Sequence, residues 1–323
     1  MSGAGLTRAN VTRLVVLACI WGASFLLIKF ALEGLSPIQI VLARLSFGTL
    51  ALVAILAVRR IALPRGGRMW GHLALMAVVA NVIPFFLFGW GEQRITSGMA
   101  GVLNGTTPLF TLVFASAALP EERLSLGRAL GLLIGFTGVV LVVGPWDQSG
   151  ANALSGQLAI VLAAACYGVA FTYTRRFISG RGNPLALAAG QLGAGAVLLW
   201  VAAPLVAADP VSLTTRVVLS AGALGAVGTG LAYMLYYRLI TDAGATTASM
   251  VTYLIPVVAV ILGVAVLREP LTWNLFAGAA VVIFGVAVAD GRLRRRPAGA
   301  GAEPAGVDAP VLAAEDAGRD GRH

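Results

Sequence analysis

Long apolar stretches, separated by short polar connections, recur along almost the whole chain. Ten of them approach or exceed the roughly 18 residues that a helix needs to cross a bilayer. They cover residues 11–31, 37–58, 70–90, 97–119, 128–145, 155–175, 184–206, 216–237, 246–267 and 273–290. The sequence lacks the alternation of polar and apolar positions that marks a membrane β-barrel. The pattern therefore predicts an all-α integral membrane protein with ten transmembrane helices.

Composition and charge support this interpretation and add an orientation. Apolar residues make up 58% of the chain and charged residues 11%, whereas about a quarter of an ordinary soluble domain is charged. The net charge of +9 does not indicate nucleic-acid binding, because the arginines lie in short connections rather than on one basic face. With the N-terminus inside, most of these arginines fall on the inner side, and only Arg94, Arg216 and Arg268 fall on the outer side. The positive-inside rule therefore predicts a multi-pass protein of the cytoplasmic membrane with both termini cytoplasmic.

Both ends of the sequence carry a prediction. The first apolar stretch is long enough to span and lacks a clear small-residue cleavage site, so we expect it to remain as a helix rather than to be removed as a signal peptide. Residues 291–323 are rich in Ala, Gly, Pro and acids without a periodic apolar face, which predicts a disordered cytoplasmic tail.

Residues that carry redox, metal or acid–base chemistry are scarce within the apolar stretches. Cys19 and Cys166 lie inside two of them, which favours small buried side chains over a disulfide. His72 begins the third stretch, and His323 is the last residue. We therefore expect no metal, no cofactor, no catalytic residues and no enzyme activity.

The chain repeats itself at an offset of about 146 to 148 residues. The repeat joins two units, residues 11–145 and 155–290, and each unit holds five apolar stretches. Because five is odd, the second unit must enter the membrane from the opposite face. Inverted repeats of this kind are typical of secondary transporters, although a duplication that only builds a stable scaffold is an alternative. The matched positions are Trp21-Gly22 with Tyr167-Gly168, Pro37 and Arg44 with Pro184 and Gln191, Pro108 with Pro256, and Glu122 with Glu269.

Several short motifs, in this order, resemble the EamA type of the drug/metabolite transporter superfamily over residues 11–290. They are WGASF in the first stretch, the Pro37-to-Arg44 spacing, TPLF followed by LPEERLS, and YLIPVVAVILGVAVLREPLT in the second unit. The resemblance implies a transporter of small polar metabolites, often an exporter of amino acids or related compounds. It also implies a cavity lined mainly by the third, fourth, eighth and ninth helices and their neighbours.

Proline and hydroxyl residues occur near the start of both the fourth and the ninth stretches. Proline removes a backbone donor and kinks a helix, and an exposed carbonyl is tolerated at membrane depth only where it faces protein or water. This symmetry predicts a hydrated cavity between the two units, and ordinary helix packing is the alternative. We expect Asn104, Thr107 and Pro108 to face Thr252, Tyr253 and Pro256.

Arg44 is the costliest residue of the sequence in a membrane. It follows Pro37 by seven positions, and therefore lies about 10 Å into its helix. A charge at such depth costs at least about 2 to 3 kcal/mol. We expect a buried partner or the carboxylate of a substrate beside it, with outward snorkelling as the alternative. Lys29 lies near the same end, where snorkelling or pairing with Glu33 is expected, and Gln191 occupies the matching position in the second unit.

The acids Glu33, Glu92, Glu121, Glu122, Glu269 and Asp290 all lie near the ends of stretches. Proton-driven carriers commonly use a deep acid or histidine, so exchange and facilitated efflux stay as open as proton antiport.

Further polar and aromatic residues lie on or near the stretches that the resemblance assigns to the cavity. Substrate contact and ordinary packing are both open for each of them. They are Trp21, Asn81, Trp90, Tyr167, Tyr233, Tyr237 and Tyr253, together with Gln191 at the position that matches Arg44 in the second unit.

Small residues four apart mark the fifth stretch, where Gly127, Gly131 and Gly135 share a helix face. Such faces let helices approach closely. We expect the fifth and tenth helices to brace each unit or to meet another copy in a homodimer. Glu122 and Glu269 stand just before these two helices, where each is expected to cap the helix that follows.

Together these observations predict a ten-helix secondary transporter that works by alternating access between the bilayer's two sides, with export as the expected direction. A channel or facilitator and a membrane-embedded enzyme or scaffold are the alternatives. The sequence does not identify the small-molecule substrate, the energy source or the oligomeric state.

Overall fold

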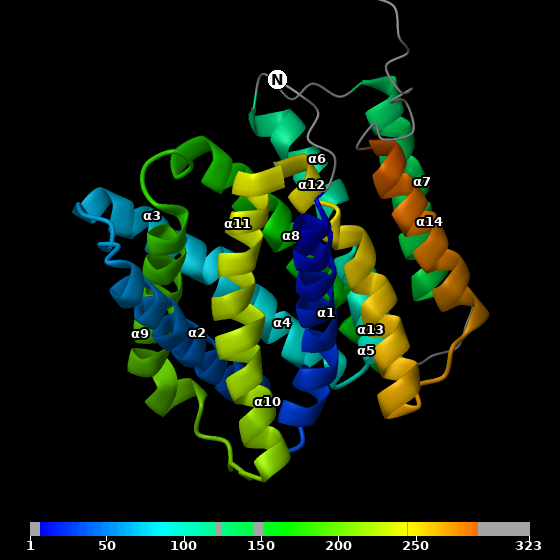
Figure 1. The fold of residues 1–323 in the computed structure, drawn as a ribbon. Helices are drawn as coiled ribbons and strands as arrows, with labels where there is room; N and C mark the ends of the chain where they lie inside the picture. The colour runs from blue at the N-terminus through cyan, green and yellow to red at the C-terminus, as the bar shows by residue number, and fades with distance from the viewer. Residues whose placement is uncertain (1–6, 120–124, 145–150, 244, 290–323) are drawn as a thin grey trace, which may run out of the picture.

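A computed structural model describes residues 7–119, 125–144, 151–243 and 245–289. Within these residues, the regular structure consists of helices alone (Figure 1). The first part contains α1 (Arg8–Ala31), α2 (Pro37–Arg59), α3 (Gly67–Ala77), η1 (Val78–Val82), α4 (Ile83–Glu92), α5 (Ser97–Asn104), α6 (Thr107–Ala118) and α7 (Leu126–Val143). The second part contains α8 (Ala151–Phe177), α9 (Pro184–Val206), α10 (Thr215–Gly225), η2 (Ala226–Leu231), α11 (Ala232–Ala243), α12 (Ala245–Ala248), α13 (Val251–Leu267) and α14 (Trp273–Ala289).

Eight helical stretches in the described residues are long and apolar enough to cross a membrane. Three of them join several elements: α3, η1 and α4 run on as one, as do α5 with α6 and α10 with η2 and α11. The helices α13 and α14 are apolar but shorter. The protein is therefore a multi-pass, all-α membrane protein. Each of the ten predicted spans coincides with one of these helical stretches, and the count of ten stays a prediction.

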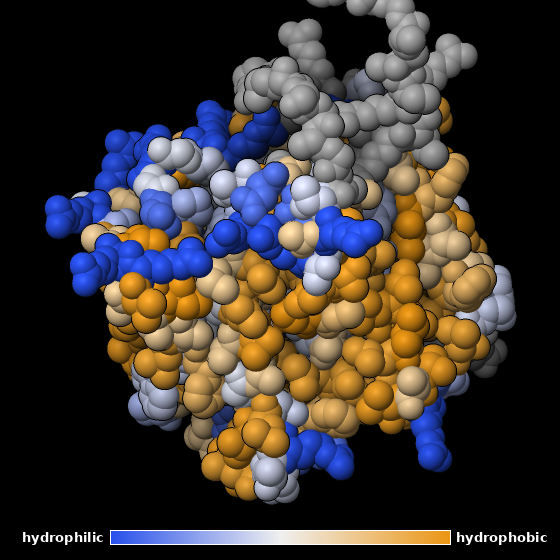
Figure 2. Space-filling view, viewed as in Figure 1, coloured by the Kyte–Doolittle hydropathy of each residue, from blue (hydrophilic) through white to orange (hydrophobic). Residues whose placement is uncertain are grey.

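The surface fits a bilayer environment. Figure 2 shows a broad apolar belt around the visible face, with hydrophilic side chains gathered above it and a smaller number below. Large apolar side chains such as Leu205, Val201 and Phe276 are mostly exposed. In water such a belt would mark an interaction surface, and hydrocarbon covers it without cost. Exposed arginines in the connections, including Arg65 and Arg181, lie outside the apolar helices.

The order of elements in the first part returns in the second. The helices α2 and α9 have the same length of 23 residues, and each begins with a proline, Pro37 and Pro184. Proline suits this position because the first backbone N–H groups of a helix have no internal partner. The π-helical segment η1 interrupts the third helical stretch, and η2 interrupts its counterpart. The repeat seen in the sequence is thus accompanied by a repeated order of elements.

The helices α7 and α14 lie side by side at one edge of the molecule (Figure 1). Glycines make the close approach possible: a Cβ on Gly131 would collide with Ala289, and one on Gly138 would lie 2.6 Å from the backbone nitrogen of Val282. The predicted glycine face of α7 therefore packs against α14. Nothing in this arrangement tests the predicted homodimer.

The predicted cap of α14 by Glu269 is wrong. The Glu269 carboxylate instead accepts hydrogen bonds from Ser97 N at 2.7 Å, Ser97 Oγ at 3.0 Å and Gly98 N at 3.0 Å. It therefore caps α5, whose free N–H groups and positive dipole end attract an anion. Glu269 stands just before α14 in the sequence, but the fold brings its carboxylate to the start of α5. Glu122 and the predicted tail lie outside the described residues.

Candidate functional site

Arg44 lies buried on α2 and has the partner that its depth requires. Its Nε donates a hydrogen bond to Thr229 Oγ1 on η2 at 3.2 Å. Its guanidinium carbon also lies 3.9 Å from the ring centroid of Phe85 on α4. A hydrogen bond from a charged donor and a cation–π contact both offset the cost of burial. The side chain therefore points into the protein and does not snorkel toward the membrane surface.

A second polar contact has the same construction with the two repeats exchanged. Gln191 Nε2 on α9 donates to Asn81 Oδ1 on η1 at 2.6 Å. Gln191 follows Arg44 by 147 positions, and Thr229 follows Asn81 by 148, which is the offset of the repeat. In each contact, a polar residue of α2 or α9 reaches a π-helical segment of the other repeat. We call the two contacts the Arg44–Thr229 link and the Gln191–Asn81 link.

The π-helical segments give these links their acceptors. A π-helix is rare and occurs often at functional sites, because its wider turn displaces the usual backbone hydrogen bonds. The Thr229 hydroxyl donates to the carbonyl of Leu224 five residues earlier, at 3.1 Å, and keeps a lone pair for Arg44. Asn81 and Thr229 are both completely or almost completely buried. Both polar groups are thus held in place by their segments.

Glycines let the helices of each link approach. A Cβ on Gly225 would lie 2.9 Å from Arg44 O and 3.0 Å from Gly48 N, so no larger residue fits between α2 and η2. On the other side, a Cβ on Gly195 of α9 would lie 3.1 Å from Leu45 Cδ1 and 3.3 Å from Ala77 Cβ. Close packing of these helices positions the polar side chains within hydrogen-bond reach.

Tyrosines connect the two links. Tyr167 of α8 and Tyr233 of α11 are near enough to Arg44 to interact with its charge. Tyr233 also lies beside Asn81. The ring of Tyr237 is 6.3 Å from that of Tyr233, so the row continues along α11.

Trp21 joins the same region from α1. Its Nε1 donates to the carbonyl of Gly228 in η2 at 3.2 Å, and its ring lies 5.4 Å from Tyr236. The structure therefore brings seven of the predicted site residues into one region: Trp21, Arg44, Asn81, Tyr167, Gln191, Tyr233 and Tyr237.

Two side chains supply hydrogen-bond donors to this region. Asn81 Nδ2 is buried and has no partner among the described residues. The Arg44 guanidinium carries five N–H donors, and the one on Nε bonds to Thr229. A buried unpaired donor is costly, so an oxygen-rich anion would be stabilised here.

The six residues predicted around the paired prolines form a separate group. The helix breaks between α5 and α6 at Gly105 and Thr106, just before Pro108, whereas Pro256 lies within the continuous helix α13. The two repeats meet here through Gly105, since a Cβ on it would lie 3.0 Å from Pro256 Cγ. Asn104, Thr107 and Pro108 thus lie on the α5–α6 side of this contact, and Thr252, Tyr253 and Pro256 lie on α13.

The threonine hydroxyls of this second group donate hydrogen bonds to backbone carbonyls three residues earlier in the chain. Thr107 Oγ1 donates to Asn104 O at 2.8 Å, and Thr252 Oγ1 donates to Ser249 O at 2.6 Å. Tyr253 packs with the apolar cluster around Leu109. These contacts stabilise the helix starts, which is the packing role that the sequence left open.

A cleft of about 490 Å³ lies between the start of α2, the α4 region and the end of α9. Of the predicted site residues, Trp90 alone contributes to its wall. The wall is mostly apolar and does not include the two links. Trp90 also stacks on the Arg94 guanidinium at 3.6 Å. We therefore place Trp90 outside the region around Arg44.

Lys29 does not pair with Glu33, so that one of its predicted roles is wrong. Its Nζ donates to the backbone carbonyls of Ile95, at 2.7 Å, and of Glu92. Glu33 pairs instead with Arg216 at 3.0 Å. The sequence reasoning also missed Thr229 and Phe85. Thr229 could have been found, because it lies at the repeat offset from Asn81.

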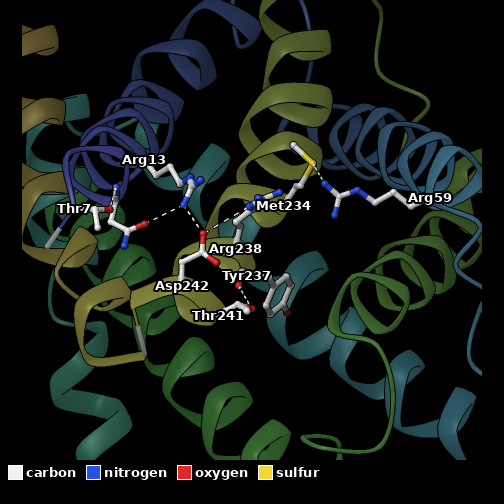
Figure 3. Close-up of polar contacts among 9 residues, drawn as sticks. Thr7, Arg13, Arg59, Met234, Tyr237, Arg238, Thr241 and Asp242 are labelled. Carbon is white, nitrogen blue, oxygen red and sulfur yellow. Dashed lines mark hydrogen bonds and ion pairs between the residues drawn. The ribbon is translucent and has the colours of Figure 1, made fainter. Parts of the chain in front are cut away.

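Charged residues also join the two repeats at one end of the bundle. Arg13 of α1 and Arg238 of α11 converge on Asp242, at 2.5 Å and 3.7 Å (Figure 3). Arg59 of α2 contacts Met234 Sδ of α11 at 3.6 Å (Figure 3). Asp242 and its two arginine partners are all partly exposed, so each ion pair contributes little stability.

Comparisons with known proteins agree with this architecture. The sequence model of the EamA-like transporter family matches twice, over residues 11–144 and 154–289. An uncharacterized transporter of Archaeoglobus fulgidus is 30% identical over 274 residues, which is 82% of this chain and 93% of that protein. The uncharacterized inner membrane transporter YedA of Escherichia coli K12 is 27% identical, covering 84% of this chain and 88% of its own length.

Similarity also extends to a plant protein and to a solved structure. The chloroplastic WAT1-related protein At3g02690 of Arabidopsis thaliana is 29% identical, covering 88% of this chain and 70% of its own. A solved crystal structure has a similar fold, with a TM-score of 0.65 at 21% identity, over 89% of this chain and 98% of that one.

Proposed function

The chain belongs to the EamA-like transporter family, and from this membership we propose that it is a secondary transporter that moves small polar metabolites, such as amino acids, by alternating access. The transport is export across the cytoplasmic membrane, and both termini lie in the cytoplasm. The names of the relatives support transport in general, and one of them is named as an inner membrane protein. The placement of the arginines supports the orientation.

The pair of equivalent links between the repeats is the observation that carries this proposal. Residues 11–145 and 155–290 act as two five-helix units of opposite orientation, giving ten spans. The Arg44–Thr229 link and the Gln191–Asn81 link then face opposite sides of the membrane. A transporter built from inverted repeats opens to one side by a motion that mirrors its opening to the other. Each link closes one side.

The depths of the links fit this scheme. Arg44 and Gln191 each follow the first residue of their helix by seven positions, which is about 10 Å of helix. With α2 and α9 antiparallel in a hydrocarbon layer of about 30 Å, the two links lie on either side of the midplane. A substrate held between them is accessible from one side when one link is broken.

The chemistry of this central region supports a carboxylate-bearing substrate. Arg44 and the unpaired Nδ2 of Asn81 supply donors, and the hydroxyls of Tyr167 and Tyr233 lie close to Arg44. A bidentate guanidinium is well suited to a carboxylate. Trp21, Tyr237 and Gln191 complete the walls of the same site.

The residues around the paired prolines act in the motion of this transporter. Asn104, Thr107 and Pro108 in one repeat, and Thr252, Tyr253 and Pro256 in the other, line the path on either side of the Gly105–Pro256 contact. Trp90 contributes at the outer end, beside the cleft.

A comparison of the medium from cells with and without the protein tests both substrate and direction. We expect one or a few carboxylate-bearing metabolites to accumulate outside only when the protein is present. Purified protein in liposomes should then show saturable flux of that metabolite, with stimulation by the same metabolite on the opposite side. Flux that neither saturates nor responds to the opposite side would instead identify a channel. No difference in the medium, together with no flux in liposomes, would refute transport.

A further inference from the structure

Glu92, the last residue of α4, is a buried acid that the proposed transport site does not use. Its side chain is 0% exposed. Neither carboxylate oxygen has a hydrogen-bond partner among the described residues. The burial follows from close packing of α4 on α8, because a Cβ on Gly91 would lie 2.8 Å from Ile160 Cδ1 and 3.0 Å from Gly156 O. A charged carboxylate in such a place is expensive unless it is paired.

The charges of three groups on the surrounding elements act on Glu92. Lys29 comes from α1, Arg44 from α2, and Glu269 from the residues after α13. From α8, Gly156 and Ile160 lie against Gly91 at this end of α4, and neither of them ionises. Lys29 donates hydrogen bonds to the backbone carbonyls of Glu92 and Ile95. Its ammonium group is therefore close to the acid without satisfying the carboxylate oxygens.

The two acids of this group differ in their hydrogen bonds. Glu269 accepts three, two of them from the backbone at the start of α5. Glu92 accepts none. Glu92 is therefore the acid whose carboxylate no hydrogen bond from the described residues holds in place.

Charge balance connects Glu92 to the transport site. With Glu92 and Glu269 both ionised, their two negative charges balance the two positive charges of Lys29 and Arg44. An anionic carboxylate bound at Arg44 would leave one negative charge in a region of low dielectric. One proton on Glu92 restores neutrality. The reaction is simple addition of a proton from water to the carboxylate, with no oxidation or reduction.

We propose that Glu92 is the proton-binding group of this transporter and takes up a proton when an anionic carboxylate occupies Arg44. Carboxylate and proton then cross the membrane together. The coupling of proton movement to carboxylate transport rests on the proposed function, whereas the binding and release of a proton by Glu92 does not. The sequence alone suggested no such group, because Glu92 stands at the end of an apolar stretch.

Infrared difference spectroscopy of the purified protein in lipid tests the proton exchange without any substrate. The immobilised protein is perfused with buffers of rising pH, and the C=O band of protonated carboxylic acids is followed. We expect a band that disappears during the titration and that is missing in Glu92→Gln. The matched control is Glu33→Gln, whose side chain is 45% exposed and pairs with Arg216, and it should keep the band. A wild-type protein without the band, or a Glu92→Gln variant that keeps it, would overturn the proposal.

Removing the neighbouring cation tests the link to Arg44. In Arg44→Gln, the Glu92 band should persist to higher pH, because a positive charge that favours the ionised acid is gone. An unchanged titration would show that the two residues are not coupled. Size-exclusion profiles of all variants report whether the fold survives.

Transport then separates this inference from the proposed function. Liposomes receive an imposed pH difference and a mixture of isotope-labelled amino acids and short monocarboxylates. One pH unit is a tenfold proton ratio, so one proton per anion supports accumulation of up to about tenfold. We expect the wild type to accumulate an anionic label and Glu92→Gln to lose the accumulation. Equal accumulation by both proteins would overturn the inference but would leave the proposed transport function intact. If the wild type carries no label at all, the proposed function is refuted, and the infrared titration alone decides whether Glu92 exchanges a proton.

Discussion

Replacing Thr229 with Val should open the transporter toward the outside. Valine has nearly the shape of threonine but lacks the hydroxyl that accepts from Arg44 Nε at 3.2 Å. Hydrogen bonds to charged groups contribute about 1.5–3 kcal/mol, and a buried donor left unpaired costs a similar amount. In the proposed mechanism this link forms only when the outer side is closed, so its loss shifts the equilibrium toward the state that is open to the outside. About 1.4 kcal/mol is a factor of ten, so the shift should be roughly 10- to 150-fold.

Cysteine labelling measures this shift. A reporter cysteine replaces Tyr237 on α11, which lies on the cytoplasmic side of the Arg44–Thr229 link in the proposed orientation. Cys19 and Cys166 are first replaced by Ser. A thiol reagent that does not cross membranes is applied to either side of oriented vesicles. In the Thr229→Val background, labelling from the outside should become faster. Gln191→Leu breaks the other link, and should speed labelling from the inside.

Two results would contradict this reasoning. Faster labelling from the inside in Thr229→Val would show that the Arg44–Thr229 link closes the inner side and not the outer side. Unchanged labelling in both variants would show that neither link closes a path. Thr241→Val in the same helical stretch is the matched control, because the Thr241 hydroxyl is exposed and donates to the carbonyl of Tyr237 one turn earlier. It should leave both rates as they are.

Three further predictions concern other parts of the molecule. Arg44→Gln should lower transport of anionic and zwitterionic substrates at least tenfold with expression intact, and unchanged kinetics in liposomes would refute its role. Gly131→Ala should lower the melting temperature by forcing α7 and α14 apart, at a cost of about 1–3 kcal/mol, whereas Gly222→Ala, which meets nothing within 4 Å, should not. Cysteines at Asn104 and Tyr253 should react with a water-soluble thiol reagent during turnover, and protection of both would exclude these positions from the path.

The sequence is sufficient to predict the helical stretches, two of the helix starts and the repeat. The apolar stretches mark the helices because the lipid interior admits few other spanning structures. Pro37 and Pro184 mark two helix starts, since proline is tolerated best in the first turn. The repeat offset already paired Arg44 with Gln191. These predictions rest on rules that act within one helix or between copies of one pattern.

The partners of the polar residues depended on tertiary packing. Thr229 lies 185 positions after Arg44, and its hydroxyl is available because a π-helical turn displaces it from an ordinary helix register. Glu269 reached α5 rather than the next helix for a similar reason. Glu92 was grouped with acids at helix ends, where water is expected. Gly91 lets α8 cover it, and no periodicity in the sequence indicates that cover.

The neutral partners of Arg44 explain how a costly charge can serve transport. Placing it in the membrane costs at least about 2–3 kcal/mol. The bond to Thr229 returns about 1.5–3 kcal/mol, and the contact with Phe85 contributes up to about 2 kcal/mol when desolvated. A hydroxyl and an aromatic ring thus make the burial tolerable without neutralising the charge. An acid in direct contact would compete with a carboxylate substrate for the guanidinium, whereas Thr229 and Phe85 leave its remaining donors available. The repeat places Gln191 at the matching position, so the second link closes without a charge, and the anion is attracted toward one side of the site.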